Sequence, residues 1–158
     1  MGAEPKQEQA GAAIRAFRAK DAAALMSILR DSPEAANWTQ ASYRELMNSP
    51  GAVAFVSESD GGVTGFVIGR QVVDEAEVLN LAVGSLARRK GQGSALLKAA
   101  LEEFRVLGVR RVYLEVRESN VAARAFYAKH GFSQTGKRLK YYRKPEEAAI
   151  VMEKKFGP

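Results

Sequence analysis

The sequence predicts an α/β fold in which a mixed sheet of six to seven strands carries helices on both faces. Two observations support this class. A Ser-Asp-Gly-Gly turn at residues 59–62 separates two runs rich in β-branched and aromatic residues, which is typical of an antiparallel hairpin. Two β–α units then follow at residues 78–107 and 112–130, and each returning strand is expected to pair parallel through a right-handed crossover.

The first half of the chain is expected to hold four strands and two short helices. We place the strands at residues 14–17, 53–56, 63–73 and 77–83. Asp21 is a candidate N-cap for the first helix and Thr39 for the second. The apolar stripes of these helices are Leu25, Ile28 and Leu29, and Tyr43, Leu46 and Met47.

The second half is expected to hold two helices and three strands. The helix after the glycine-rich segment ends at Gly108 and carries one apolar face, made of Leu96, Leu97, Ala100, Leu101, Phe104 and Leu107. The next helix starts at residues 119–120, ends at Gly131 and packs through Ala122, Ala125 and Phe126. The strands are placed at residues 111–116, 132–137 and 148–152, with a basic loop containing two tyrosines at residues 138–145.

Length and composition indicate one globular domain. Of the 158 residues, we expect residues 1–11 to form a flexible tail and residues 12–158 to form the domain. The chain has no cysteine and one histidine, so we expect neither a metal site nor a cysteine nucleophile. It has no apolar run of membrane-spanning length and no signal-peptide core, so we expect a cytoplasmic protein without a membrane partner. The net charge of +6 favours anionic partners.

The most informative stretch is residues 88–94, Arg-Arg-Lys-Gly-Gln-Gly-Ser, between a strand and a helix. Gly91 and Gly93 permit positive φ and leave room for an anion, and backbone N–H groups at a helix N-terminus bind phosphate. The segment does not fit a P-loop, and Leu96 stands where a dinucleotide-binding motif needs its third small residue. The motif alone leaves two alternatives, a phosphate site or a basic turn that binds nothing.

A carboxylate and a phenol follow this segment in the chain. Glu115 lies near the end of the strand at residues 111–116, and its neighbours Leu114 and Val116 point to the opposite face. Tyr127 lies two turns into the next helix. Both can line the space beside the glycine-rich segment, as general base and general acid. The alternatives are an exposed strand residue for Glu115 and a core residue for Tyr127.

Residues 77–132 resemble the acetyl-coenzyme A core of the GCN5-related N-acetyltransferase (GNAT) superfamily. Arg88-Arg-Lys-Gly-Gln-Gly-Ser-Ala is similar to its (Arg/Gln)-x-x-Gly-x-(Gly/Ala) pyrophosphate loop, and Asn120, Ala-Phe-Tyr127 and Gly131-Phe132 are similar to its second half. Asn80-Leu-Ala-Val and Leu114-Glu-Val-Arg-Glu-Ser-Asn resemble the RimI-like branch, the ribosomal-protein-alanine N-acetyltransferases. Asn37-Trp38 stands where that branch has Pro-Trp.

The resemblance implies a GNAT fold, acetyl-CoA as co-substrate and no metal. It implies direct acetyl transfer, in a ternary complex, to the N-terminal amine of a small-subunit ribosomal protein that begins with alanine. Glu115 would be the general base and Tyr127 the general acid, and Trp38 and Tyr142 would line the acceptor site. The implied cofactor-binding residues are Leu81, Ala82, Val83, Arg88, Arg89, Lys90, Gly91, Gln92, Gly93, Ser94 and Asn120.

Other functions stay open from the sequence. The acceptor could be another protein N-terminus, a lysine or a small-molecule amine, and a non-enzymatic alternative is a module whose basic loops bind RNA. The presence of both Glu115 and Tyr127 argues against the RNA-binding module. We expect no direct nucleic-acid contact, unless basic residues 138–144 face ribosomal RNA when the enzyme acts on assembled particles. We expect His130, at a helix end, to be structural.

Overall fold

The computed structural model describes residues 12–32, 39–88, 91–143 and 146–157. The tail predicted at residues 1–11 lies outside these residues. Seven strands form one sheet in the order β1-β2-β3-β4-β5-β7-β6. The elements are β1 (Ala13–Ala16), the 3-10 turn η1 (Ala19–Asp21), α2 (Ala22–Arg30), α3 (Gln40–Met47), β2 (Ala52–Ser59), β3 (Gly62–Val72), β4 (Glu75–Val83), the 3-10 turn η2 (Ser85–Ala87), α4 (Gln92–Val106), β5 (Arg111–Arg117), α5 (Val121–Lys129), β6 (Ser133–Tyr142) and β7 (Glu147–Lys155).

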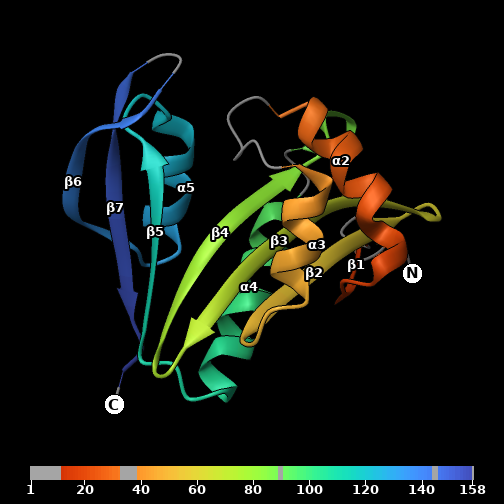
Figure 1. Ribbon diagram of the computed structural model, residues 1–158, viewed down its shortest axis with the longest axis horizontal. Helices are drawn as coiled ribbons and strands as arrows, with labels where there is room; N and C mark the ends of the chain where they lie inside the picture. Colours follow the sequence, from red (N-terminus) through yellow and green to blue (C-terminus); the bar gives the residue numbers. More distant parts are fainter. Residues whose placement is uncertain (1–11, 33–38, 89–90, 144–145, 158) are drawn as a thin grey trace, which may run out of the picture.

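Helices cover both faces of the sheet, which confirms the predicted fold class (Figure 1). Side chains of α4, including Leu96, Leu97 and Phe104, form one core with the sheet, and α5 packs against the edge of this core. On the opposite face, α2 and α3 form a second core through Leu25, Ile28 and Tyr43. We call these the α4/α5 face and the α2/α3 face. No described helix is both long and apolar enough to cross a membrane.

The strands β4 and β5 pair only at their beginnings. They run parallel and share the register pairs Glu75–Arg111, Ala76–Val112 and Glu77–Tyr113. Beyond these pairs β4 continues to Val83 and β5 to Arg117, and Figure 1 shows the two strands diverging. The sheet is therefore split into two halves, β1–β4 and β5-β7-β6. Backbone groups along the open edge of β4 are left without a strand partner, and such groups bind extended ligands.

A β-bulge in β4 changes which residues face each side of the sheet. Ile68 of β3 is opposite Asn80, whereas the next residue, Gly69, is opposite Val78, so Leu79 is the extra residue. Val78 packs in the core on the α4/α5 face, but Ala82 packs in the core on the α2/α3 face. The bulge therefore directs Leu81 to the α4/α5 face, where it packs at the edge of the core.

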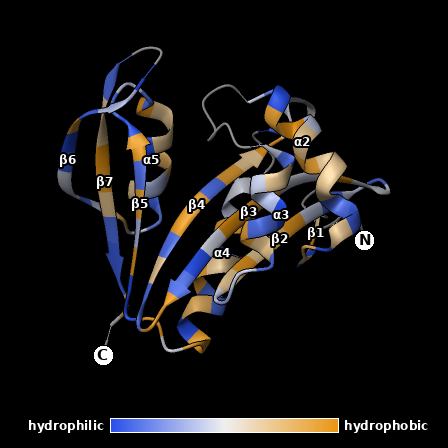
Figure 2. Cartoon of the chain, in the orientation of Figure 1, coloured by the Kyte–Doolittle hydropathy of each residue, from blue (hydrophilic) through white to orange (hydrophobic). Residues whose placement is uncertain are grey.

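One predicted parallel pairing is wrong. The parallel contact between β4 and β5 is confirmed, but β7 lies between β5 and β6 and is antiparallel to both. The physical reason is hydropathy. β7 has buried Ala148, Ala149, Ile150 and Met152, whereas β6 is polar and takes the edge (Figure 2). Residues 138–142, predicted as a loop, form the end of β6, where Lys140 adopts a positive φ of 55° inside a bulge.

Several helix details also differ from the prediction. Leu107 is 45% exposed because α4 ends at Val106, before the apolar stripe would turn back to the sheet. In α5 the packed residues are Ala123, Phe126 and Tyr127, while Ala122 and Ala125 are exposed. The α5 stripe is rotated because the rings of Phe126 and Tyr127 both meet the core, which places Ala123 rather than Ala122 and Ala125 beside them.

The two predicted N-caps have different outcomes. Thr39 caps α3 by accepting a hydrogen bond from the Ser42 N–H, as predicted. Asp21 precedes α2 but does not cap it, because its carboxylate accepts hydrogen bonds from the Arg15 guanidinium and the Arg18 N–H. Asp21 therefore joins the 3-10 turn to β1.

Candidate active site

The glycine-rich segment forms the N-terminus of α4. Gly91 is the N-cap and has a φ of 82°, and a Cβ atom there would meet nothing within 4 Å. The backbone conformation, rather than space, therefore favours glycine at this position. Gly93 is helical and does not use the positive φ that glycine permits. The N–H groups of the first helical turn lack intrahelical acceptors, and the helix dipole makes this end attractive to anions. Arg89 and Lys90 lie outside the described residues.

Two side chains of this segment point away from a prospective anion. The Gln92 side chain is buried, and its Oε1 accepts hydrogen bonds from Ser57 Oγ at 3.1 Å and Thr64 Oγ1 at 2.6 Å. Arg88 donates through Nε to the Val83 carbonyl at 2.9 Å and through Nη2 to the Asp31 carbonyl at 2.7 Å. These bonds hold the segment on β2, β3 and α2. The oxygen of the Gln92 side chain is thus used inside the protein, and the backbone N–H of Gln92 belongs to the first turn of α4.

The side chain of a buried asparagine, Asn80, accepts a hydrogen bond from the backbone at the open edge of β4. Asn80 is 6% exposed, its Nδ2 donates to Tyr43 Oη at 2.7 Å, and its Oδ1 accepts from the Leu81 N–H at 3.0 Å. The Leu81 N–H is therefore directed away from β3, and a ligand carbonyl could replace the Asn80 oxygen. The neighbouring Ala82 and Val83 complete the strand segment predicted to bind the cofactor arm. Sequence analysis quoted Asn80 as part of a motif but gave it no role, although a polar residue in an otherwise apolar strand is a usable signal.

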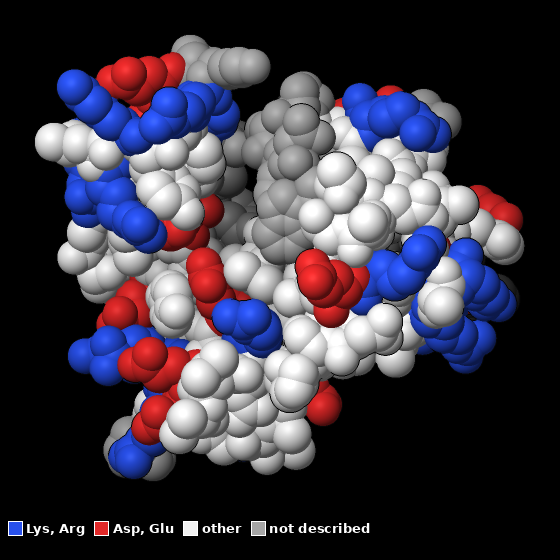
Figure 3. All heavy atoms as spheres, viewed as in Figure 1, with Lys and Arg blue, Asp and Glu red and all other residues white. Residues whose placement is uncertain are grey.

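Glu115 faces the α2/α3 side of the sheet, as the alternation of β5 predicts. Leu114 and Val116 are buried in the core of the opposite face. The Glu115 side chain is 14% exposed, and its Oε2 accepts a hydrogen bond from Arg138 Nη1 at 2.6 Å. The surface is hollowed between the β5-β7-β6 half and the helices α2 and α3, with acidic side chains along the hollow (Figure 3). Arg138, predicted as part of a solvated basic loop, is therefore the partner of the candidate base.

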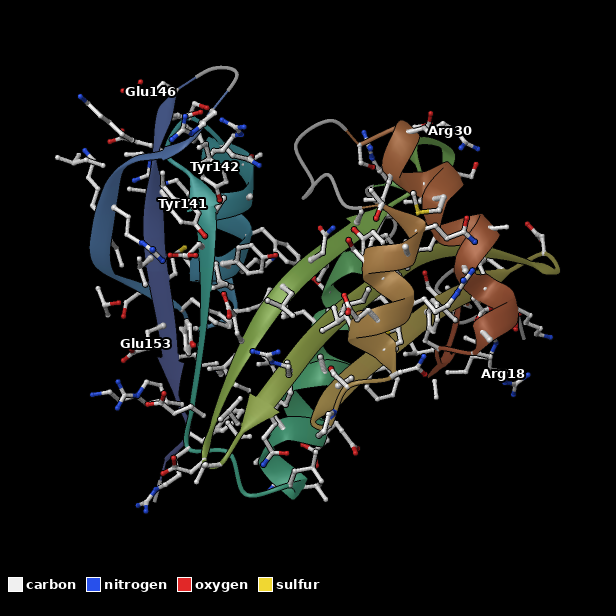
Figure 4. All side chains as sticks on the ribbon, in the orientation of Figure 1. Arg18, Arg30, Tyr141, Tyr142, Glu146 and Glu153 are labelled. Atoms are coloured by element: carbon white, nitrogen blue, oxygen red, sulfur yellow. The ribbon has the colours of Figure 1, made fainter. Side chains whose placement is uncertain are left out.

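Tyr141 and Tyr142, at the end of β6, lie side by side (Figure 4), and the Arg138 guanidinium is 4.3 Å from the Tyr141 ring centre. The rings of Tyr141 and Tyr142 meet edge to face at 5.1 Å, and the guanidinium of Arg117 lies 4.3 Å from the Tyr142 ring centre. Burial, and then the charge of Glu115, raise the pKa of Tyr142 to about 12, so this phenol stays protonated at neutral pH. The predicted acceptor residue Tyr142 is thus close to Glu115 in space. Trp38, the other predicted acceptor residue, lies outside the described residues.

A second carboxylate shares this face. Glu77 is half-buried at the last register pair before β4 and β5 diverge. Burial, and then the negative charge of Glu115, raise its pKa. Sequence analysis missed Glu77, because it predicted the parallel pairing of β4 with β5 but not the register, which brings Glu77 opposite Tyr113, two residues before Glu115.

Tyr127 lies on the α4/α5 face of the sheet, at the edge of the core. Its ring meets Phe126 at 5.2 Å and Phe132 at 5.7 Å between centroids. Burial raises the pKa of Tyr127, so it remains a protonated phenol at neutral pH. Its hydroxyl has no hydrogen-bond partner in the part of the chain that the structure describes. Glu115 and Tyr127 therefore belong to opposite faces of the sheet, and the structure does not bring the two side chains into direct contact.

The last predicted cofactor-binding residue, Asn120, lies at the start of α5. Asn120 is the N-cap of α5, and its Oδ1 accepts a hydrogen bond from the Ala123 N–H at 3.1 Å. The contact of Asn120 with a cofactor stays a prediction. Because Oδ1 is used by the cap, the side-chain NH₂ group would have to make this contact. The described residues contain no cluster of metal-ligating side chains.

Comparison with known proteins agrees with this geometry. Residues 22–132 match the sequence model of the Acetyltransferase (GNAT) family. The ribosomal protein bS18-alanine N-acetyltransferase of Escherichia coli is 39% identical over 100 residues, which are 62% of this chain and 68% of that protein.

Two solved structures share the fold over nearly the whole chain. The crystal structure of the ribosomal-protein-S18-alanine N-acetyltransferase from Escherichia coli has a TM-score of 0.82 and 29% identity, and the alignment covers 92% of this chain and 94% of that one. Ard1 from Thermoplasma volcanium has a TM-score of 0.83 and 32% identity, covering 92% and 98%. The match over 22–132, together with the split sheet and the glycine N-cap of α4, shows that this chain belongs to the GNAT family of acetyltransferases, which use acetyl-CoA.

Proposed function

We propose that this enzyme transfers the acetyl group of acetyl-CoA to the N-terminal α-amine of ribosomal protein bS18, with alanine as the first residue. The observation that carries the proposal is the ion pair of Glu115 with Arg138, beside the tyrosine pair and the open edge of β4. The names of the similar Escherichia coli enzyme and structure support the choice of acceptor. Residues 12–158 act as one domain, and an acceptor that belongs to the ribosome places the enzyme in the cytoplasm.

The cofactor lies across the gap in the sheet. Its diphosphate binds the backbone N–H groups of residues 89–94, where the helix dipole and the basic side chains favour negative charge. Its pantetheine arm extends along Leu81, Ala82 and Val83. The thioester carbonyl accepts the Leu81 N–H and replaces the Asn80 oxygen that holds this donor in the free protein. Asn120 adds a hydrogen bond from its NH₂ group at the start of α5.

The reaction needs only modest help from a base. An α-amine has a pKa near 8, so roughly a tenth of it is already neutral at pH 7, whereas a lysine amine is neutral in less than about one part in a thousand. The neutral amine attacks the thioester carbon, and Glu115 takes the proton that nitrogen loses as the amide forms. A single carboxylate therefore suits an N-terminal amine better than a lysine.

Tyr127 completes the transfer. The C–S bond breaks, and the sulfur receives the phenolic proton of Tyr127 to give free coenzyme A. A cysteine-like thiol has a pKa near 8.5, below that of a buried phenol. Full proton transfer to a finished thiolate is therefore uphill, so Tyr127 protonates the sulfur while the C–S bond breaks. The phenol then regains a proton from solvent, and no acyl-enzyme is formed.

Thiol release from acetyl-CoA with synthetic peptides tests the proposal. The panel contains a peptide with the bS18 N-terminal sequence, the same peptide with a blocked N-terminus, the same peptide with blocked lysines, and versions that differ only in the first residue. We expect release to disappear on N-terminal blocking, to survive lysine blocking and to be fastest with alanine. Release that disappears only on lysine blocking would replace the proposal with a lysine acetyltransferase.

A further inference from the structure

The side chains of Tyr43 and Asn80 form a buried polar pair next to the open edge of β4. Tyr43 lies on α3 and is 2% exposed, and Asn80 lies on β4 and is 6% exposed. Asn80 Nδ2 donates to Tyr43 Oη at 2.7 Å, while Asn80 Oδ1 accepts from the Leu81 N–H at 3.0 Å. One asparagine therefore connects a helix of the α2/α3 face with the backbone donor that the proposed function assigns to the thioester carbonyl.

Packing fixes the Tyr43 end of this pair. The Tyr43 ring belongs to the core of the α2/α3 face and meets the Phe66 ring edge to face, with 6.3 Å between centroids. Ala82, the residue after Leu81, is buried in the same core. Because a ring in a close-packed core has one position, the Tyr43 oxygen is fixed in space. That oxygen accepts from the Asn80 NH₂ group, so the amide turns its oxygen to the Leu81 N–H.

Stability alone does not explain a polar pair at this position. Burial of a hydroxyl and an amide costs free energy that their hydrogen bond only offsets, and two apolar side chains of similar shape can be equally stable. The advantage of the pair is orientation. A donor that stabilises developing charge is most effective when its direction is fixed before the ligand binds, and side chains locked by packing provide that direction.

We propose that Tyr43 and Asn80 are positioning residues for the acetyl transfer. Tyr43 holds the Asn80 amide, and the amide keeps the Leu81 N–H directed to the open edge of β4. The thioester oxygen then takes over an N–H group that is already aligned with the negative charge this oxygen gains as the amine attacks. Both side chains act through the Leu81 N–H rather than on the reacting atoms. The inference rests on the placement of the thioester in the proposed function.

Three variants separate positioning from stability. Tyr43→Phe keeps the ring and removes the oxygen that accepts from Asn80 Nδ2. Tyr43→Phe/Asn80→Leu replaces both polar side chains by apolar ones. Ser49→Ala is the matched control, because it removes a hydrogen bond at the end of α3, from Ser49 Oγ to the Leu46 carbonyl, that does not involve Asn80.

Thermal unfolding and steady-state thiol release with the N-terminal alanine peptide distinguish the two roles. Tyr43→Phe should lower the thermal midpoint and lower kcat about tenfold, because the Leu81 donor is still present but has lost its alignment. In the double variant the midpoint should return towards the wild-type value, since neither partner is left behind, while kcat stays about tenfold low. Ser49→Ala should keep the wild-type kcat. A kcat that recovers together with the midpoint would overturn the proposal, because the pair would then be purely structural.

NMR spectra of the wild-type protein supply a test that depends on no variant. S-ethyl-coenzyme A has a CH₂ group in place of the thioester carbonyl, so it offers the Leu81 N–H no acceptor. We expect acetyl-CoA to shift the signals of the Leu81 amide and the Asn80 side-chain amide beyond the shifts that S-ethyl-coenzyme A causes. Equal shifts with the two compounds would refute the exchange of acceptors at Leu81.

Failure of the proposed function gives a different result. A chain that shows these carbonyl-dependent shifts but acetylates no N-terminal alanine peptide would contradict the acceptor and leave the role of Tyr43 and Asn80 in place.

Discussion

Arg138 of β6 donates a 2.6 Å hydrogen bond to Glu115 of β5, although β7 lies between these two strands. The side chains meet above β7, where Val151 is opposite Glu115 and Ala149 is opposite Arg138. An edge strand thus orients the candidate base. Since the Arg138 guanidinium also lies 4.3 Å from the Tyr141 ring, which meets the Tyr142 ring, the candidate base, its partner and the two tyrosines form one connected group.

Glu115→Gln should abolish most of the activity without affecting the cofactor. Glutamine keeps the shape and can still meet Arg138, but it cannot accept a proton. We expect kcat to fall about 10²- to 10⁴-fold, the usual range for loss of a general base. The dissociation constant for acetyl-CoA, measured by calorimetry, should change less than about twofold. Steady-state thiol release with the N-terminal alanine peptide measures kcat, and a kcat close to wild type would assign the base to another group.

Arg138→Gln should reduce activity but not stability. The Arg138 side chain is 56% exposed, and exposed ion pairs contribute at most about 1 kcal/mol. Loss of the orienting bond should lower kcat/KM for the peptide several-fold and leave the thermal midpoint nearly constant. Arg105→Gln, which removes an exposed pair with Glu102 on α4, is the matched control. Identical kinetics for the two variants would mean that the Glu115–Arg138 contact has no role in positioning.

Tyr127→Phe should slow turnover while acetyl-CoA still binds. The variant keeps the ring contacts with Phe126 and Phe132 and loses only the hydroxyl, so the fold should be retained. We expect a decrease in kcat of about 10²-fold, because the departing sulfur lacks its proton donor. Tyr113→Phe on β5 is a suitable control for the removal of a phenol. Full activity of Tyr127→Phe would remove the general acid from the mechanism.

Asp21→Asn should destabilise the protein near neutral pH and much less in acid. The Asp21 side chain is 3% exposed, and hydrogen bonds from Arg15 are the main cause of its lowered pKa. A carboxyl group whose folded pKa is depressed stabilises the fold above its unfolded pKa, near 3.9, and loses this effect as the pH falls through the folded pKa. Denaturant unfolding at pH 7 should show a loss of about 2 kcal/mol. If the difference in unfolding free energy between wild type and Asp21→Asn stayed constant as the pH fell to the folded pKa of Asp21, the coupling between stability and protonation of Asp21 would be contradicted.

Gly69→Ala should be strongly destabilising because of steric overlap. A Cβ atom at this position would lie 2.7 Å from both the Glu77 carbonyl oxygen and Phe104 Cζ. Phe104 is fully buried, so neither neighbour can move freely, and overpacking of this kind costs about 1–3 kcal/mol. Gly136→Ala, whose Cβ would lie 3.7 Å from Val151 Cβ, should be nearly neutral. Thermal unfolding of the two variants provides the comparison, and equal midpoints would refute the steric argument.

Much of this protein follows from local sequence. The glycine-rich start of α4, the Thr39 cap, the turn at residues 59–62 and the direction of Glu115 on β5 each depend on residues within one or two turns of chain. Backbone φ preferences and the alternation of side chains act over that range, and therefore the sequence predicts them. The fold class and the acetyltransferase family rest on the same short segments.

Features that depend on contacts between distant parts of the chain were decided by the tertiary structure. The place of β7 between β5 and β6, the bulge at Leu79 and the partnership of Glu115 with Arg138 all result from which apolar surfaces are buried together. Strand order and register are set by this burial and by the pairing of whole strands, not by local preference. The sequence by itself therefore determined which residues can do the chemistry, and the packing of the split sheet determined which of them lie close enough to act together.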